Sequence, residues 1–159
     1  MNDTAKTPYA LMCEELAALM DGVPEPLPNM ANLSALIFQR MDRLNWAGFY
    51  LNTGSELLLG PFQGKPACIR IPFEKGVCGA AARLNETQLV SDVHLFPGHI
   101  ACDSASRSEL VVPVRAGGRL VAVLDLDSPE KGRFTREDAE GMEALARILG
   151  ENCDWTSLI

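Results

Sequence analysis

The sequence predicts an α+β fold in which helices cover a central, mostly antiparallel β-sheet. Most of the helical periodicity lies near the two ends of the chain, and most of the alternation typical of strands lies between them. Two apolar runs, 109–116 and 119–127, flank Gly117-Gly118, a dipeptide typical of a β-hairpin. Strands joined by such a short turn pair antiparallel, and their apolar face requires a covering layer of helices.

Length and composition predict a single domain, 1–159, made of an N-terminal helical segment, 1–43, and a core, 44–159. The chain has 159 residues, of which 47% are apolar, enough to fill one core. Its formal net charge is −7. This charge argues against nucleic acid or an anionic membrane surface as a partner, because phosphate groups are bound by clustered Lys and Arg.

Two helices are predicted in the N-terminal segment. Thr7 followed by Pro8 is typical of a helix start, since Thr caps free N–H groups and Pro fits the first turn. The three prolines within 21–29 separate this helix from the next. The predicted core stripes are Met12, Leu16, Leu19 and Met20 in the first helix, and Leu33, Leu36, Ile37 and Met41 in the second.

The first predicted strand is the segment NWAGFYLN, 45–52. Alternation places Trp46, Gly48 and Tyr50 on one face, and the apolar residues between them on the other. Core packing accounts for the two aromatic residues, and a ligand pocket is the competing account, since their polar tips need partners. Further elements are predicted as strands at 56–62, 67–73 and 87–92 and a short helix over 77–84.

The connection 92–107 is long for a compact domain, which makes it a candidate functional segment. The hairpin 109–127 follows it. A last helix is predicted after Thr135, which caps it, with Asp138 near the positive end of the helix dipole. Its predicted core stripe is Met142, Leu145, Ala146 and Leu149.

Two carboxylates end the second strand of the hairpin. Asp125 and Asp127 are two apart, so they share a face, and the opposite face is predicted to be core. The strand could simply run out into solvent at a turn over 127–129. Alternatively, the two carboxylates could form a cation site, since carboxylates near an apolar strand need a compensating positive charge. The predicted core residues of the opposite face are Leu120, Ala122, Leu124 and Leu126.

Glu109 begins the partner strand, and its position depends on the hairpin register. A plain two-residue turn at Gly117-Gly118 places Glu109 opposite Leu126, on the wrong face. One extra, bulged residue places it opposite Asp127, on the face of the other carboxylates. The sequence leaves both registers open.

Three of the five cysteines are candidates for chemistry. Cys102 lies in the polar part of the long connection, Cys68 is flanked by Lys65 and Arg70, and Cys78 begins a helix whose N-terminus favours a thiolate. Cys13 and Cys153, in the terminal helices, are predicted to be structural. The start of the chain does not resemble a signal peptide, no run is long enough for a membrane span, and a cytoplasmic protein with reduced thiols is expected.

No metal site is predicted from cysteine spacing, because C-x-x-C is absent and the other spacings match no common zinc pattern. His94 and His99 lie in the same long connection as Cys102. A Cys/His metal site or a Cys–His nucleophilic pair is therefore an alternative, although no ligand pair has the usual helical or knuckle spacing.

Read together, several segments resemble the free methionine-(R)-sulfoxide reductases, which are single-domain enzymes of the GAF fold. The resemblance runs from about 45 to 141 in order, through NWAGFY, LGPFQGKPACIRI, GVCG, DVHLFPGHIACDSASRSELVVPV, AVLDLDS and RFTREDAEG. It implies that Cys102 is the catalytic cysteine, Cys68 the principal resolving cysteine and Cys78 a secondary partner. It implies that the substrate pocket is lined by Trp46, Tyr50, Glu109, Asp125 and Asp127.

The same resemblance implies a thioredoxin-dependent L-methionine (R)-S-oxide reductase with no bound cofactor and, by family expectation, a homodimer. Attack of the Cys102 thiolate on the sulfoxide sulfur would yield a sulfenic acid, and Cys68 would convert it to a disulfide that thioredoxin reduces. The proton would come from a neutral carboxyl group or from the Trp46 N–H. A non-catalytic GAF sensor of a small ligand and a thiol redox switch are the alternative functions.

Overall fold

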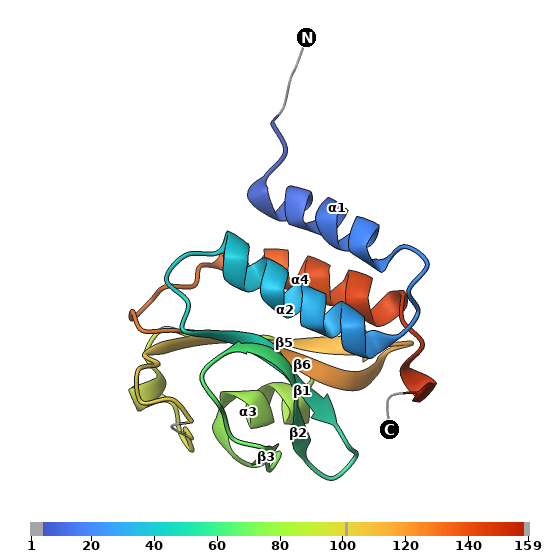
Figure 1. The fold of residues 1–159 in the computed structure, drawn as a ribbon. Coiled ribbons are helices and arrows are strands. Elements are labelled where there is room, and N and C mark those ends of the chain that lie inside the picture. The colour runs from blue at the N-terminus through green and yellow to red at the C-terminus, as the bar shows by residue number, and fades with distance from the viewer. Residues whose placement is uncertain (1–4, 101, 158–159) are drawn as a thin grey trace.

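Six strands form one sheet, which confirms the predicted α+β class (Figure 1). The computed structural model describes residues 5–100 and 102–157. The strand order is β3-β2-β1-β6-β5-β4, and each neighbouring pair is antiparallel. The strands are β1 (Trp46–Asn52), β2 (Leu57–Gly64), β3 (Arg70–Ile71), β4 (Gln88–Val90), β5 (Ser108–Ala116) and β6 (Arg119–Ser128). The helices are α1 (Pro8–Met20), α2 (Pro26–Arg40), α3 (Gly76–Leu84) and α4 (Arg136–Glu151), with short 3-10 helices at Val93–Leu95 and Trp155–Ser157.

The helices are divided unequally between the two faces of the sheet (Figure 1). α2 and α4 cover one face, α1 lies outside them, and α3 covers the other face. The larger of two buried apolar clusters lies between α1, α2 and α4 and the face of the sheet that they cover. None of the helices in the described part of the chain is long and apolar enough to cross a lipid bilayer.

The N-terminal helices follow the prediction with two differences. Thr7 caps α1 by accepting a hydrogen bond from the Ala10 N–H at 3.1 Å. Leu19 is 45% exposed, although it was predicted as core, because α1 packs mainly against α2 and α4 and a narrow stripe suffices for that contact. α2 begins at Pro26, so the break between the helices is shorter than the predicted 21–29, since Pro is tolerated in a first helical turn.

The strand predicted over 67–73 is reduced to the two residues of β3. This strand lies at the sheet edge, where Arg70 and Ile71 pair with Leu58 and Leu57. Pro72 ends it, because proline has no N–H to continue a ladder.

The hairpin of β5 and β6 has the bulged register. Glu109 pairs with Asp127, as required for the two carboxylates to share a face, and the pairing shifts by one residue near the turn. Val121 is the extra residue, since Val114 pairs with Ala122 and Arg115 with Leu120. The bulge also inverts the alternation, so Leu120 packs on the opposite face from its predicted core partners Ala122, Leu124 and Leu126.

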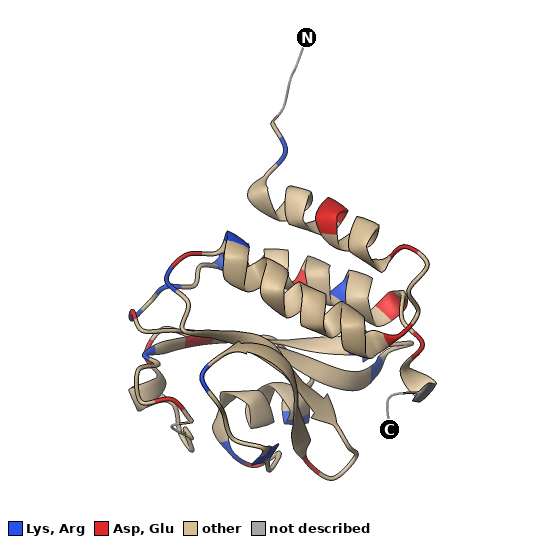
Figure 2. Ribbon diagram, in the orientation of Figure 1, with Lys and Arg blue, Asp and Glu red and all other residues tan. Residues whose placement is uncertain are grey.

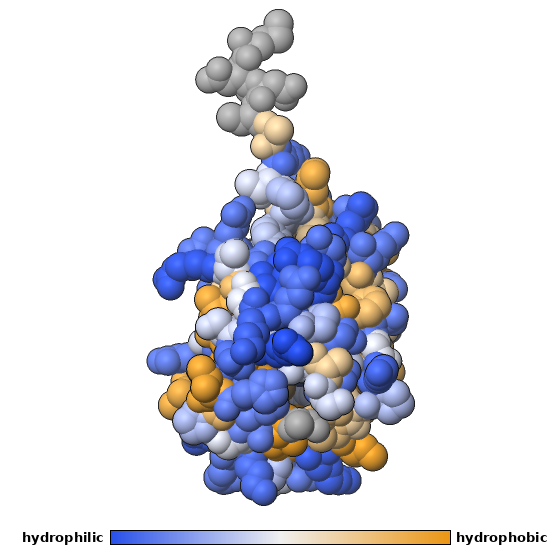
Figure 3. Space-filling model, turned by 90° about the vertical axis from the view of Figure 1, so that its left-hand side faces the viewer, coloured by the Kyte–Doolittle hydropathy of each residue, from blue (hydrophilic) through white to orange (hydrophobic). Residues whose placement is uncertain are grey.

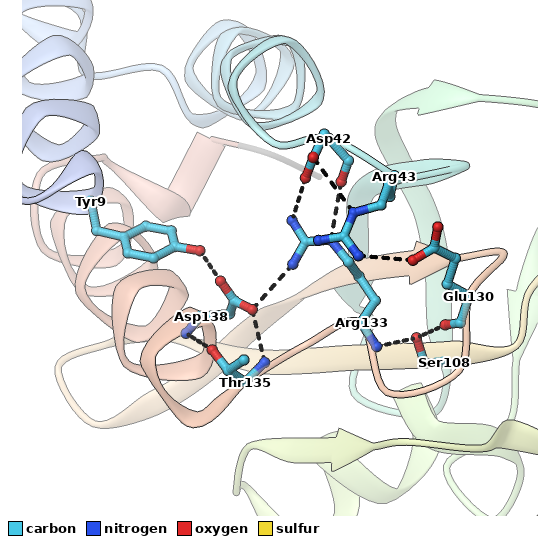
Figure 4. Close-up of polar contacts among 8 residues, drawn as sticks. All are labelled: Tyr9, Asp42, Arg43, Ser108, Glu130, Arg133, Thr135 and Asp138. Carbon is cyan, nitrogen blue, oxygen red and sulfur yellow. Dashed lines mark hydrogen bonds and ion pairs between the residues drawn. The ribbon is translucent and has the colours of Figure 1, made fainter.

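A partly buried polar network ties α1 to the rest of the helical layer (Figure 4). Tyr9 in α1 donates a hydrogen bond to Asp138, which also accepts from the Thr135 N–H at 2.8 Å and forms an ion pair with Arg133 at 3.3 Å. Thr135 caps α4 as predicted, and the Asp138 carboxylate accepts a hydrogen bond from the Thr135 N–H in return, which completes a capping box. Arg133 extends the network to Asp42, just beyond α2.

Candidate active site

The second face of the sheet carries the predicted carboxylates. β6 lies between β1 and β5, so Asp127 has Trp46 on one side and Glu109 on the other. Asp125 lies one step along the same face. Charged residues are otherwise concentrated on helix surfaces and loops, and most of the sheet is uncharged (Figure 2). Three carboxylates therefore meet on one side of an otherwise apolar sheet.

Two of the three carboxylates are buried and the third is partly buried, which excludes the alternative of a strand that runs out into solvent. Asp125 is 5% exposed and Glu109 is 7% exposed, while Asp127 is partly exposed. Asp125 Oδ1 is buried and has no hydrogen-bond partner among the described residues. A buried carboxylate oxygen without a donor is costly, so the arrangement is suited to a cationic ligand group.

α3 places a thiol against the carboxylates. Cys78, in its first turn, is buried and its Sγ lies 3.9 Å from Glu109 Oε1, as a hydrogen-bond donor. One ligand atom from each of Cys78, Glu109 and Asp125 lies within 4.8 Å of the others. The thiol and two carboxylates thus surround one small volume.

Burial raises the pKa of all three carboxyl groups. It raises the pKa of Asp125 to about 6. Burial, together with the charges of neighbouring aspartates, raises the pKa of Glu109 and Asp127 well above the usual range. Carboxylates this close disfavour one another's ionisation, and such an arrangement is suited to donating a proton and to holding a cationic group.

The helix start does not make Cys78 a thiolate, contrary to the expectation from its position in α3. Burial raises the pKa of its thiol well above the usual range, and the negative charges of Asp125 and Glu109 add to the effect. The partial positive charge of a helix N-terminus is too weak to offset complete desolvation next to carboxylates.

The other two candidate thiols form a disulfide. Cys68 and Cys102, 34 positions apart, are bonded with their Cα atoms 5.5 Å from each other. Cys102, Cys78 and all three carboxylates line the same pocket. Cys102 belongs to the long connection 92–107, which is yellow at the left of Figure 1. Figure 3 shows the molecule from that side, where a mainly hydrophilic surface is broken by separate apolar patches.

Asn45 anchors the segment that carries Cys102, a role that the sequence analysis missed. Its Nδ2 donates to Asp103 Oδ2 at 2.9 Å and to Ser106 Oγ at 3.0 Å. Its own N–H bonds to the Asp127 carbonyl at 3.0 Å, so Asn45 joins the loop to the acidic strand. The available signal was an amide residue directly before an apolar strand, which alone does not identify a partner.

The two aromatic residues belong both to the apolar packing and to the pocket lining. Trp46 and Tyr50 are buried and stack against each other with ring centroids 5.8 Å apart. Their polar tips bond to backbone carbonyls: Trp46 Nε1 donates to Lys65 at 3.2 Å, and Tyr50 OH donates to Cys68 at 2.8 Å. The Trp46 N–H is therefore engaged, which weakens its case as the proton donor and favours a carboxyl group.

Comparison with known proteins identifies the family. The GAF domain profile matches residues 25–152. The free methionine-R-sulfoxide reductase of Escherichia coli (strain K12) is 50% identical over 141 residues, which are 89% of this chain and 86% of that protein. The protein of the same name from Saccharomyces cerevisiae is 46% identical over 143 residues, 85% of this chain and 79% of that protein. This chain belongs to the free methionine-R-sulfoxide reductase family.

Solved structures of the family have the same fold as this chain. The free methionine-R-sulfoxide reductase of Neisseria meningitidis, in complex with its substrate, superposes with a TM-score of 0.84 at 40% identity, covering 92% of this chain and 90% of that one. The fRMsr of Staphylococcus aureus, also in complex with substrate, gives a TM-score of 0.86 at 45% identity, covering 91% and 95%.

The two histidine rings lie 6.2 Å apart, centroid to centroid, but Cys102 is bonded to Cys68 and the described residues form no Cys/His metal site. His94 Nδ1 lies 3.2 Å from Asp92, at the exposed end of the connection, whereas His99 lines the pocket of the reductase fold. Among the described residues, the one group of side chains placed to ligate a metal contains neither histidine.

Proposed function

We propose that this protein reduces free L-methionine-(R)-sulfoxide to methionine. The observation that carries the proposal is that Cys102, disulfide-bonded to Cys68, lines the same pocket as the cluster of carboxyl groups. Family membership supports the same reaction.

The first step uses the Cys102 thiolate as nucleophile. Its sulfur attacks the sulfoxide sulfur while a neutral carboxyl group protonates the sulfoxide oxygen, and methionine leaves with Cys102 oxidised to a sulfenic acid. Glu109 is the favoured donor, because burial and the charges of the neighbouring aspartates raise its pKa well above the usual range and so favour its protonated form.

The second step closes the disulfide. The Cys68 thiol condenses with the Cys102 sulfenic acid, releasing water and giving the bond present in the structure. An external dithiol then reduces this bond by exchange and becomes a disulfide itself. Thioredoxin, acting in the cytoplasm, is the reductant that we propose.

The acidic pocket accounts for a preference for the free amino acid. Asp125 Oδ1 is buried and lacks a partner among the described residues, so the substrate's ammonium group can supply the missing donor. A peptide-bound methionine has no ammonium at that place. Lys65, which lines the same pocket, is positioned to attract the substrate's carboxylate.

The test is a coupled assay in which thioredoxin reduction consumes NADPH. Free L-methionine-(R)-sulfoxide should be reduced, whereas the (S) epimer and a blocked peptide should not. Cys102→Ser should abolish turnover, because no sulfenic acid can form. Cys68→Ser should still release one methionine per protein and then stop. Binding without consumption of the free (R) form would instead indicate a sensor, and oxidation without turnover would indicate a redox switch.

A further inference from the structure

We propose that Cys78, Glu109 and Asp125 form an inhibitory binding site for Zn²⁺. The cation would occupy the place assigned above to the ammonium group of the substrate. Zinc binding itself is independent of the proposed function, and only its effect on turnover rests on that function.

The donor set is the first argument. An ammonium group needs only oxygen acceptors, and a neutral thiol in the same cluster serves it poorly. A thiolate with two carboxylates suits a borderline-soft divalent ion, whereas Ca²⁺ and Mg²⁺ prefer oxygen ligands alone. Cys78 is 4% exposed and lies among these carboxylates rather than in an apolar core alone, so its thiol is available as a ligand only to something inside the pocket.

Distances support the same assignment. With Zn–S of about 2.3 Å and Zn–O of about 2.1 Å, tetrahedral ligation separates sulfur from oxygen by about 3.6 Å. Cys78 Sγ and Glu109 Oε1 are 3.9 Å apart, so a shift of a few tenths of an ångström suffices. The Asp125 ligand atom lies within 4.8 Å of both.

A further, independent observation concerns the free oxygen of Asp125. Its Oδ1 is buried without a partner among the described residues, in a residue that is 5% exposed and lines the pocket. Zinc would satisfy this atom and replace the proton that Cys78 now shares with Glu109. Three protein ligands leave a fourth tetrahedral position for water.

Proton competition sets the expected pH dependence. A thiol must lose its proton to ligate zinc, so the affinity of the site for zinc should rise with pH. The other titratable groups that line the same pocket are Asp103, Asp127, His99, Lys65 and Tyr50.

The experiment uses the oxidised protein with Cys13→Ser and Cys153→Ser. The disulfide withholds Cys68 and Cys102 in this form, so Cys78 is the one remaining free thiol. Co²⁺ serves as the spectroscopic probe, and a thiolate-to-cobalt charge-transfer band should appear and be removed by Zn²⁺. Zinc affinity is measured by calorimetry, with and without excess free methionine, whose ammonium should compete.

Variants of the three ligands should weaken or abolish metal binding, whereas a control variant in the same pocket should affect it less. Cys78→Ala should remove the band, and Glu109→Gln should raise the zinc Kd at least tenfold. Asp127→Asn is the matched control, since it removes a carboxylate from the same pocket but not from the trio, and it should change the Kd less. Circular dichroism checks that each variant is folded.

Absence of the band in the oxidised parent, or an equal band in Cys78→Ala, would overturn the proposal. An equal loss of affinity in Asp127→Asn and Glu109→Gln would overturn it too, in favour of diffuse attraction by the acidic pocket. Either result leaves the sulfoxide assay unaffected, so failure of the zinc site and failure of the reductase proposal are distinguishable.

Discussion

Two buried aspartates, Asp138 in the helical layer on one side of the sheet and Asp125 in the pocket on the other, differ in their hydrogen-bond partners. Asp138, at the start of α4, is 8% exposed and meets Tyr9, Thr135 and Arg133 (Figure 4). Burial would raise its pKa, but these hydrogen bonds and the nearby guanidinium lower it overall. Asp125, 5% exposed, lacks a partner for one oxygen among the described residues, and burial raises its pKa to about 6.

The difference separates a structural carboxylate from one held ready for a ligand. A buried charge stabilises a fold only when donors and a counter-charge accompany it. Asp138 has both within the chain, so it closes a network that fixes α1 and α4. Asp125 has a buried oxygen that lacks a hydrogen-bond donor among the described residues, and a ligand can supply that donor. Without a ligand, this unpaired oxygen lowers the stability of the fold.

The largest expected effect is on activity. Asp125→Asn should lower kcat/KM for free methionine-(R)-sulfoxide by roughly 10- to 150-fold, because a hydrogen bond to a charged group is worth about 1.5–3 kcal/mol. Asp138→Asn, on the other face, should change kcat/KM less than threefold. Steady-state kinetics of the two variants check this, and similar losses in both would show that the two carboxylates are not functionally distinct.

Stability should respond in the reverse order. Asp138→Ala should reduce the free energy of unfolding by about 2–3 kcal/mol, since it removes a helix-cap partner and charged hydrogen bonds. Asp125→Asn should be neutral or should stabilise by up to about 1 kcal/mol at pH 7, because it removes a buried charge without a partner. Urea titrations of the oxidised protein measure both, and a comparable loss in Asp125→Asn would contradict the distinction.

The two aspartates should also affect the pH dependence of stability with opposite signs. Asp125 has a raised pKa, so its contribution is full below about pH 4 and is lost as pH rises through about 6, a change of about 2–3 kcal/mol. Asp138 has a lowered pKa, so its contribution is present above about pH 4 and is lost as pH falls further.

Urea unfolding at a series of pH values tests both signs. Asp125→Asn should flatten the upper part of the profile, with a residual slope from Glu109 and Asp127, whose pKa values are raised in the same direction. Asp138→Asn should flatten the acid part only. A profile that rises from pH 4 to pH 7 in the parent would contradict the assignment for the pocket.

The smallest expected effect is at Tyr9. Tyr9→Phe removes the hydroxyl that donates to Asp138 and should cost about 0.5–1.5 kcal/mol of stability, with no change in kcat/KM. Thermal unfolding and the coupled assay measure the two quantities. A loss of activity without a loss of stability would mean that the helical layer and the pocket are coupled.

Much of the fold was readable from local chemistry. The helix caps at Thr7 and Thr135 and the alternation in β1 depend on neighbouring residues alone, and the structure agrees with all three predictions. Exposure of Leu19 was not readable, because it depends on how narrow the contact of α1 with the other helices is.

The sequence predicted which residues belong to the site but not how they are arranged in space. The resemblance to a family named the pocket residues, yet periodicity left the register of Glu109 open, and a helix start suggested a thiolate at Cys78 that burial prevents. The role of Asn45 depends on a tertiary contact with Asp103 and Ser106, which no local pattern contains.

The bulge at Val121 makes an exposed hairpin tip intolerant of changes in length. Chains usually gain or lose residues freely at such tips. Here, removing Val121 while keeping the Gly117-Gly118 turn would restore the plain register, so Glu109 would turn toward the helices and Leu110 into the pocket. The composition of the acidic pocket is therefore maintained by the number of residues in a distant surface turn.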